Sequence, residues 1–288
     1  MRASAPAGYE HIEVAPVAGA LGAEIFGADL SRPLEDKIFA EIRRAFLEHN
    51  VIFFRGQSLT PEQFLDFARR WGGIHRHPYV QPIDGYPDIL EILKTETDTR
   101  NFGGRWHTDQ SFAPRPALGT LLYALETPSH GGDTAFANQY LAYDALSDGM
   151  KTMLDGLRAV FNGDQVHGQS RQQSYLAGGS MQARDTGGEQ TVSLHPVVRT
   201  HPETGRKALF VNYPFTIRFK DMTEEESRPL LHFLFEHASR PEFTCRFRWA
   251  KGSVAMWDNR CLQHYALNDY QGYRRSMHRV TVDGDRPF

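Results

Sequence analysis

Amphipathic periodicity predicts the helices of this chain. In the stretch 31–50, apolar residues recur every three or four positions and so line one side of a helix: Leu34, Ile38, Ile42 and Phe46. Two more helices are predicted after Thr60 and Thr223, because each threonine precedes a Gln or Glu by three positions and that pair caps a first turn. A fourth helix is predicted from about Ser147, with methionines and leucines at helical spacing behind it.

Most other apolar segments are short and rich in β-branched and aromatic residues, which predicts strands. They are bounded by Gly, Pro, Asp or Asn and cover 51–54, 89–93, 118–125, 208–211, 244–249, 253–257 and 277–282. Short strands with long insertions are typical of a jelly roll or similar β-sandwich. We therefore predict a mainly β fold with flanking helices.

The organisation of the chain is simple. No linker or repeat divides it, so we expect one domain over residues 1–288. The stretch 162–191 is rich in Gly, Gln, Ser and Arg and lacks any clear period. A loop of that length inside a compact domain is usually a lid or a disordered segment, so we predict a lid at about 162–191.

Composition narrows the classes of function. With 32 Lys+Arg against 35 Asp+Glu the net charge is -3, which argues against nucleic acid as a partner, because phosphate binding needs a basic excess. No apolar run approaches the roughly 20 residues of a membrane span, and no secretory signal is visible. The 2 Cys cannot build a disulfide framework, which favours a reducing compartment. We therefore expect a cytoplasmic protein without a membrane partner.

Candidate chemistry begins at His107 and Asp109. Residues two apart in a strand point to the same side, so this His-x-Asp could bind one ion. With a distant histidine, the set becomes two His and one carboxylate on one face of a metal, as in non-heme Fe(II) oxygenases. A chain with 13 His contains about one His-x-Asp by chance, so the alternative is an exposed His beside a turn-forming Asp.

Two arginines near the end of the chain indicate an anion. In a strand over 275–282, Arg275 and Arg279 lie on one face. If that face is the interior, both charges need a partner, and a guanidinium group suits a carboxylate held by two hydrogen bonds. The alternative is that both pair with Asp or Glu on the sheet surface.

Several motifs, taken in order, resemble the taurine dioxygenase family, the Fe(II)- and 2-oxoglutarate-dependent dioxygenases that include 2,4-dichlorophenoxyacetate dioxygenase-like enzymes. The motifs are WHTD at 106–109, GGDT at 131–134, WDNR at 257–260, QHY at 263–265 and RRSMHR at 274–279. The resemblance extends from GADL at 27–30 to GDRPF at 284–288 and so covers nearly the whole chain. It implies a double-stranded β-helix, which is a jelly roll.

The resemblance also implies roles for individual residues. His107, Asp109 and His264 would be the iron ligands. Thr134 would hydrogen-bond the distal carboxylate of 2-oxoglutarate, and Arg275 would form a salt bridge to it.

Substrate contacts follow from the same resemblance. Arg279 matches an arginine near the substrate's anionic head and the cosubstrate, His77 a histidine that contacts sulfonate, and Phe215 an aromatic residue of the pocket. Gln110, next to the metal motif, is a further candidate substrate contact. The chain departs from the taurine enzymes at Gly103, which falls where they carry an asparagine that reaches the active site.

The resemblance therefore implies a dioxygenase that uses Fe(II), 2-oxoglutarate and O2, hydroxylates a small anionic substrate and releases succinate and CO2. A sulfonate or sulfate ester is favoured over taurine itself, and the alternative is an aryloxy or other carboxylic acid. Outside this class, a metal-dependent hydrolase and a non-enzymatic anion-binding β-barrel stay open. Members of the family are often homo-oligomers, so we expect a dimer or tetramer.

Overall fold

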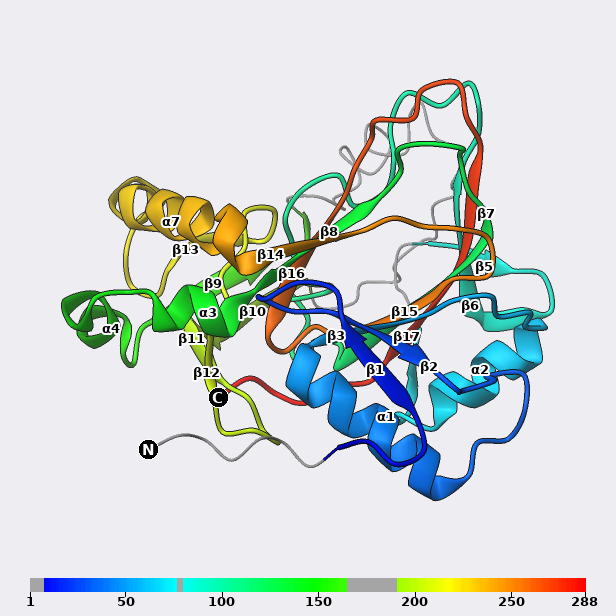
Figure 1. The fold of residues 1–288 in the computed structure, drawn as a ribbon. Helices are drawn as coiled ribbons and strands as arrows, with labels where there is room; N and C mark the ends of the chain where they lie inside the picture. Colours follow the sequence, from blue (N-terminus) through cyan, green and yellow to red (C-terminus); the bar gives the residue numbers. More distant parts are fainter. Residues whose placement is uncertain (1–7, 77–79, 165–190) are drawn as a thin grey trace.

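Figure 1 shows the computed structural model of the chain, which describes residues 8–76, 80–164 and 191–288. Within these residues the largest sheet has nine strands in the order β1-β2-β3-β15-β7-β17-β6-β5, with β4 paired to β17. These strands are β1 (Glu13–Pro16), β2 (Ala23–Phe26), β3 (Val51–Phe54), β4 (Ile74–His75), β5 (Pro82–Ile83), β6 (Tyr86–Lys94), β7 (Gly119–Glu126), β15 (Val254–Asp258) and β17 (Arg275–Val282). Early and late strands alternate in this sheet, which favours the single domain expected over 1–288; that division stays a prediction.

Three smaller sheets complete the β structure of the described residues. The one that faces the large sheet has the order β14-β8-β16, and the others are β10-β9-β13 and β11-β12. Their strands are β8 (Thr134–Asn138), β9 (Arg158–Asn162), β10 (Val192–Pro196), β11 (Val198–Thr200), β12 (Lys207–Leu209), β13 (Thr216–Phe219), β14 (Thr244–Phe247) and β16 (Leu262–Ala266). The mainly β fold with a jelly-roll core is therefore confirmed, although many of the strands were not predicted, β8 and β16 of the facing sheet among them.

Alternating side chains divide the core on the two faces of the large sheet. Leu121 and Tyr123 of β7 pack outward with the helices, whereas Leu122 and Ala124 pack inward against residues of the facing sheet such as Phe136. This period of two is what a sheet buried on both sides requires. The inward layer is where the polar side chains of the candidate site lie.

Helices cover the outside of this sandwich. In Figure 1, α1 (Asp36–His49) and α2 (Pro61–Arg69) lie together along the large sheet, and α3 (Gln139–Asp144), α4 (Asp148–Leu154) and α7 (Glu224–Ala238) group beside the smaller ones. A short 3-10 helix, η1 (Pro241–Phe243), follows α7.

The predicted helix starts are largely confirmed. Thr60 and Thr223 form complete capping boxes, and the Ser147 hydroxyl accepts the amide hydrogen of Met150. The start of the first helix was wrong, because α1 begins at Asp36 and not at residue 31. Pro33 disfavours helical backbone at the residue before it.

Two predictions fall on parts of the chain outside the described residues. His77, a predicted substrate contact, belongs to the segment 77–79, and most of the predicted lid at 162–191 belongs to the segment 165–190. Within the described ranges, no helix combines the length and apolarity that crossing a bilayer requires.

His195 of β10 generates a testable prediction about stability. Burial lowers the pKa of this histidine from 6.5 to about 4, and its Nε2 donates to the carbonyl oxygen of Ala113 at 2.8 Å. As the pH falls below 6.5, the unfolded chain takes up a proton at this residue while the folded chain does not. Its contribution to stability is therefore full above that pH and is lost as the pH falls toward 4.

We expect this residue to lower the free energy of unfolding by about 2 kcal/mol between pH 7 and pH 5. In His195→Gln, which keeps a donor for Ala113, that part of the pH dependence should vanish. Urea unfolding of both proteins at the two pH values measures it. Equal pH dependence in both would contradict the assignment.

Candidate active site

The backbone brings two histidines of the WHTD and QHY motifs together. His107 and His264 form an isolated β-bridge, in which each amide donates to the other's carbonyl oxygen, at 3.1 and 2.8 Å. Asp109 follows on the same side, so that its Oδ1 lies 3.6 Å from His107 Nε2 and 3.7 Å from His264 Nε2. The three ligand atoms lie within 4.8 Å of one another and all three residues are buried. Two nitrogens and one carboxylate at this spacing can hold a divalent metal ion.

The electrostatic environment shifts the pKa values of Asp109 and His264. Burial alone would raise the pKa of Asp109, but the Arg279 guanidinium and the two histidines outweigh it and hold that pKa well below its ordinary value. Burial, helped by the neighbouring His107, holds the pKa of His264 well below 6.5. Asp109 is thus an anion and His264 is neutral, which are the forms that bind metal ions.

Further residues fix the orientation of the three ligands. Thr120 Oγ1 donates to Asp109 Oδ2 at 2.7 Å and accepts from the Asn259 amide at 3.0 Å. His107 Nδ1 lies 2.7 Å from the carbonyl oxygen of Arg105, so it carries the proton and leaves Nε2 free as the ligand atom. Neither Thr120 nor Asn259 was predicted to contact the site. The sequence signal for Thr120 is that it is a polar residue at an inward position of an otherwise apolar strand.

A site for an anion lies farther along the inward face of β17. Arg275 is buried, and its Nε and Nη2 have no hydrogen-bond partner among the described residues. The indole of Trp249 contacts both this guanidinium and Thr134: its ring centroid is 5.7 Å from the Arg275 Cζ, and its Nε1 donates to Thr134 Oγ1 at 2.9 Å. Because the hydroxyl of Thr134 accepts from Trp249, its own proton is available to an anion.

Gly132 keeps this anion site compact. A Cβ at this position would lie 3.3 Å from the Tyr270 ring and 3.4 Å from Arg275 Cδ, and its φ of +69° is unfavourable for other residues. The glycine of the GGDT motif therefore lets the loop before β8 pack directly on the arginine.

Arg279 contacts the candidate metal-binding group, and Gln110 follows Asp109 directly in the chain. Arg279 Nη2 is 2.7 Å from Asp109 Oδ1, while its Nε has no hydrogen-bond partner among the described residues. Gln110 has a left-handed backbone, with φ of 50°, and neither atom of its buried amide has a partner in the described chain. Strained backbone and orphaned polar atoms of this kind concentrate at functional sites.

The structure also places two other positions that the sequence singled out, Phe215 and Gly103. Phe215 packs against Phe112, at a centroid distance of 5.1 Å, in the core beneath α7. At Gly103, a Cβ would lie 3.3 Å from His107 Cε1, so the backbone here passes directly beside the imidazole of His107.

A second group of potential ligands, His201, Asp258 and Cys261, has its polar atoms already engaged. His201 Nδ1 accepts the amide hydrogen of Glu203, and its Nε2 donates to Asp258 at 3.0 Å. Asp258 also accepts two hydrogen bonds from Arg260, at 2.8 and 2.7 Å. This group is therefore a closed polar network that braces the turn before β16.

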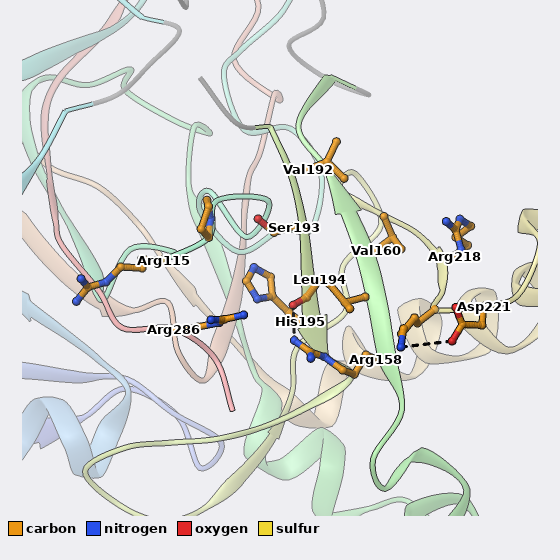
Figure 2. Close-up of a pocket in the computed structure, with 12 residues that line it drawn as sticks. Arg115, Arg158, Val160, Val192, Ser193, Leu194, His195, Arg218, Asp221 and Arg286 are labelled. Atoms are coloured by element: carbon orange, nitrogen blue, oxygen red, sulfur yellow. Dashed lines mark hydrogen bonds and ion pairs between the residues drawn. The ribbon is translucent and has the colours of Figure 1, made fainter. Parts of the chain in front are cut away.

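A basic hollow lies elsewhere, over the sheet of β9, β10 and β13 (Figure 2). Its volume is about 990 Å³, and five cationic side chains line it: Arg115, Arg158, Arg218, Lys220 and Arg286. None of the predicted site residues that the structure describes lines this hollow. It gives one face of a slightly acidic protein a positive potential that attracts anions.

The role of Thr120 can be tested through metal affinity. In Thr120→Val, Asp109 loses its partner for Oδ2 but remains a ligand, so Mn(II) affinity should fall about 10- to 100-fold. Asp109→Ala removes a ligand outright and should cost more. Titration with Mn(II) at neutral pH measures both variants. A Thr120→Val protein that binds Mn(II) as tightly as the parent would contradict this arrangement.

Comparison with known proteins extends these observations. The sequence model of the family described as "Taurine catabolism dioxygenase TauD, TfdA family" matches residues 13–281. An α-ketoglutarate-dependent sulfate ester dioxygenase of Pseudomonas putida is 35% identical over 286 residues, covering 99% of this chain and 93% of its own. A (S)-phenoxypropionate/α-ketoglutarate dioxygenase of Sphingobium herbicidovorans is 32% identical, covering 95% of each chain.

A solved structure agrees with the sequence relatives. The putative α-ketoglutarate-dependent taurine dioxygenase from Burkholderia xenovorans superposes with a TM-score of 0.81 at 37% identity, over 96% of this chain and 94% of that one. The family match spans most of the chain and both sequence relatives exceed 30% identity. The chain belongs to the TauD/TfdA family of dioxygenases.

Proposed function

We propose that this chain is an Fe(II)- and 2-oxoglutarate-dependent dioxygenase that hydroxylates a small anionic organic substrate, with a sulfate ester favoured. The observation that carries the proposal is the buried group of His107, Asp109 and His264 on one side of a sandwich whose inward face also presents Arg275. Two histidines and one carboxylate leave open positions on a metal for other ligands. Family membership and the α-ketoglutarate-dependent relatives support the same cosubstrate.

The donor set fits iron. Imidazole nitrogen and carboxylate oxygen suit Fe(II), and no thiolate reaches the group, since both Cys245 and Cys261 are buried in other surroundings. When bound, the iron with 2-oxoglutarate and O2 supplies the oxidising power, and 2-oxoglutarate leaves as succinate and CO2. The protein contributes binding, orientation and the exclusion of side reactions.

The anion site fits the distal carboxylate of 2-oxoglutarate. Arg275 and Arg279 lie four residues apart on one face of β17, which is about 13 Å along a strand. Arg279 reaches Asp109, while Arg275 has donors without acceptors in the described part of the chain. A dicarboxylate with one end at the metal would place its other end toward Arg275 and Thr134.

Arg279 and Gln110 have proposed roles at the substrate. Arg279 keeps Asp109 ionised, and its unpartnered Nε is available to the substrate's anionic head. The orphaned amide of Gln110 both donates and accepts, so it can orient a polar group beside the metal. We also keep His77 and Phe215 as proposed substrate contacts.

A sulfate ester is favoured over taurine for two reasons. The relative that acts on sulfate esters covers nearly the whole chain. Gly103 stands where the taurine enzymes carry an asparagine that reaches the active site, so that polar contact to taurine is absent from this position. Hydroxylation of the carbon that carries the sulfate oxygen gives an unstable adduct, which breaks that C–O bond and releases an aldehyde and sulfate. An aryloxycarboxylic acid stays the alternative, supported by the phenoxypropionate relative.

Three expectations stay predictions of this proposal. The use of O2 follows from the reaction class. The homo-oligomer, a dimer or tetramer, and the cytoplasmic location rest on the sequence. Size-exclusion chromatography with light scattering measures the oligomeric state directly.

A substrate panel tests the reaction class and the substrate together. The purified protein, supplied with Fe(II), ascorbate, 2-oxoglutarate and O2, should form succinate in step with the loss of an alkyl sulfate ester. Alkanesulfonates and aryloxyacids, added separately, should give lower kcat/KM. Succinate formation that no anion stimulates would overturn the anionic-substrate proposal, and release of sulfate without O2 consumption would favour a hydrolase.

Arg275→Ala tests the cosubstrate site. Loss of one partner of a buried charged pair costs about 2–5 kcal/mol, so the 2-oxoglutarate concentration for half-maximal rate should rise at least about 30-fold. Arg218→Ala, a change in the basic hollow, is the matched control and should leave that concentration unchanged. Equal behaviour of the two variants would contradict the role of Arg275.

A further inference from the structure

Lys94 lies directly opposite Arg275 in the large sheet. The two residues are register partners of β6 and β17, so their side chains share one face, as do Ile92 and Met277 next to them. Ile92 and Met277 belong to the core between the two sheets, so this face is the inward one. Lys94 is 2% exposed and Arg275 is 4% exposed. A second buried cation therefore stands beside the proposed carboxylate site.

Neither cation forms an ion pair with a carboxylate in the part of the chain that the structure describes. The Lys94 ammonium lies 3.5 Å from the carbonyl oxygen of Tyr270 and 4.5 Å from the centroid of its ring. The same tyrosine stabilises the charge of Arg275, whose Nε and Nη2 have no hydrogen-bond partner among the residues that the structure describes. Tyr270 thus interacts with both cations.

The carboxylates that attract these cations each have another partner, although the buried Oδ1 of Asp133 has none among the described residues. Asp98 attracts Lys94, but it accepts the amide hydrogen of Thr95 at 2.7 Å. Asp133 attracts Arg275, but its Oδ2 lies 2.6 Å from Nε of Arg246. Two like charges directly opposite in a sheet destabilise it, and a buried charge requires a partner.

We propose that Lys94 is a second cation for the distal carboxylate of 2-oxoglutarate, opposite Arg275 across the β6–β17 pair. This inference rests on the proposed function. A carboxylate has two oxygens, so it can accept from Arg275 and Thr134 at one and from Lys94 at the other. The bound dicarboxylate then neutralises a pair of charges that the folded chain leaves together.

The arrangement makes Lys94 a specificity residue. It would favour a 2-oxo acid with a second carboxylate and would contribute little to one without it. A purely structural lysine, held by Tyr270 and Asp98, would not distinguish the two acids. The pair of acids therefore separates the two roles.

The test compares 2-oxoglutarate with 2-oxopentanoate, which has the same carbon chain but no distal carboxylate. Each acid is titrated by calorimetry into the Mn(II)-loaded protein, so the readout is binding and not turnover. In Lys94→Met, the Kd for 2-oxoglutarate should rise at least about tenfold, while the Kd for 2-oxopentanoate stays within about twofold. Lys94→Arg, which keeps the charge, should recover part of the loss.

Controls keep the inference falsifiable. Asp98→Asn removes the proposed structural attraction on Lys94 and should leave the preference between the two acids unchanged. If Lys94→Met folds poorly, Lys94→Gln provides the same comparison, with circular dichroism to show the native fold. Equal losses for both acids, or no loss for either, would overturn the role of Lys94. Failure of the parent protein to bind 2-oxoglutarate at all would instead overturn the proposed function.

Discussion

A buried negative charge at Asp109 organises the centre of this protein. Taking a carboxylate out of water is costly unless opposite charges and hydrogen-bond donors surround it. Here Arg279 of β17 lies 2.7 Å from Oδ1 and Thr120 of β7 donates to Oδ2. Asp109 thus ties together two central strands of the large sheet, and its backbone amide donates to the side-chain oxygen of Asn259 after β15. The same contacts that stabilise the buried charge also orient the Asp109 carboxylate toward His107 and His264.

Two kinds of buried polar group coexist in the structure. In the network of His201, Asp258 and Arg260, each charge has partners within hydrogen-bond distance. Among the described residues, by contrast, Arg275 retains donors without acceptors and the Gln110 amide has no partner. A closed network stabilises a turn, whereas an open group costs stability until a ligand supplies the missing partner. This difference, and not burial itself, separates the candidate active site from the rest of the polar core.

The sequence was most informative where one simple rule decided the structure. The segment 51–54 is β3, because four buried apolar residues of this kind suit only a central strand. A period of two placed Arg275 and Arg279 on one face of β17, and both side chains are buried in the structure. The sequence of β16 carries Gln263 and His264 among its buried positions, so its hydrophobic pattern is broken and the strand was missed. Polar residues at functional positions thus mask the hydrophobic pattern by which a strand is predicted.

Long-range contacts explain the remaining misses. His237 of α7 is buried, and its Nε2 lies 2.7 Å from the carbonyl oxygen of Ala142 in α3. Neither α3 nor this contact has a signal near residue 237. The hydrogen bond between Thr120 and Asp109 likewise depends on tertiary structure, because it joins strand β7 to the loop that carries Asp109. Tertiary contacts of this kind cannot be derived from local periodicity.

The register of β17 links the fold to its chemistry. Its alternate residues face opposite layers: Val280 and Val282 pack toward α1 and α2, while Met277 packs into the core between the sheets. Arg275 and Arg279 share the side of Met277, so a slip of one residue would turn both away from the site and bury Ser276 and His278 in their place. The apolar residues that fix this register therefore hold the charges in position without touching any ligand. The hydrophobic pattern of one strand decides both where the helices pack and where an anion can bind.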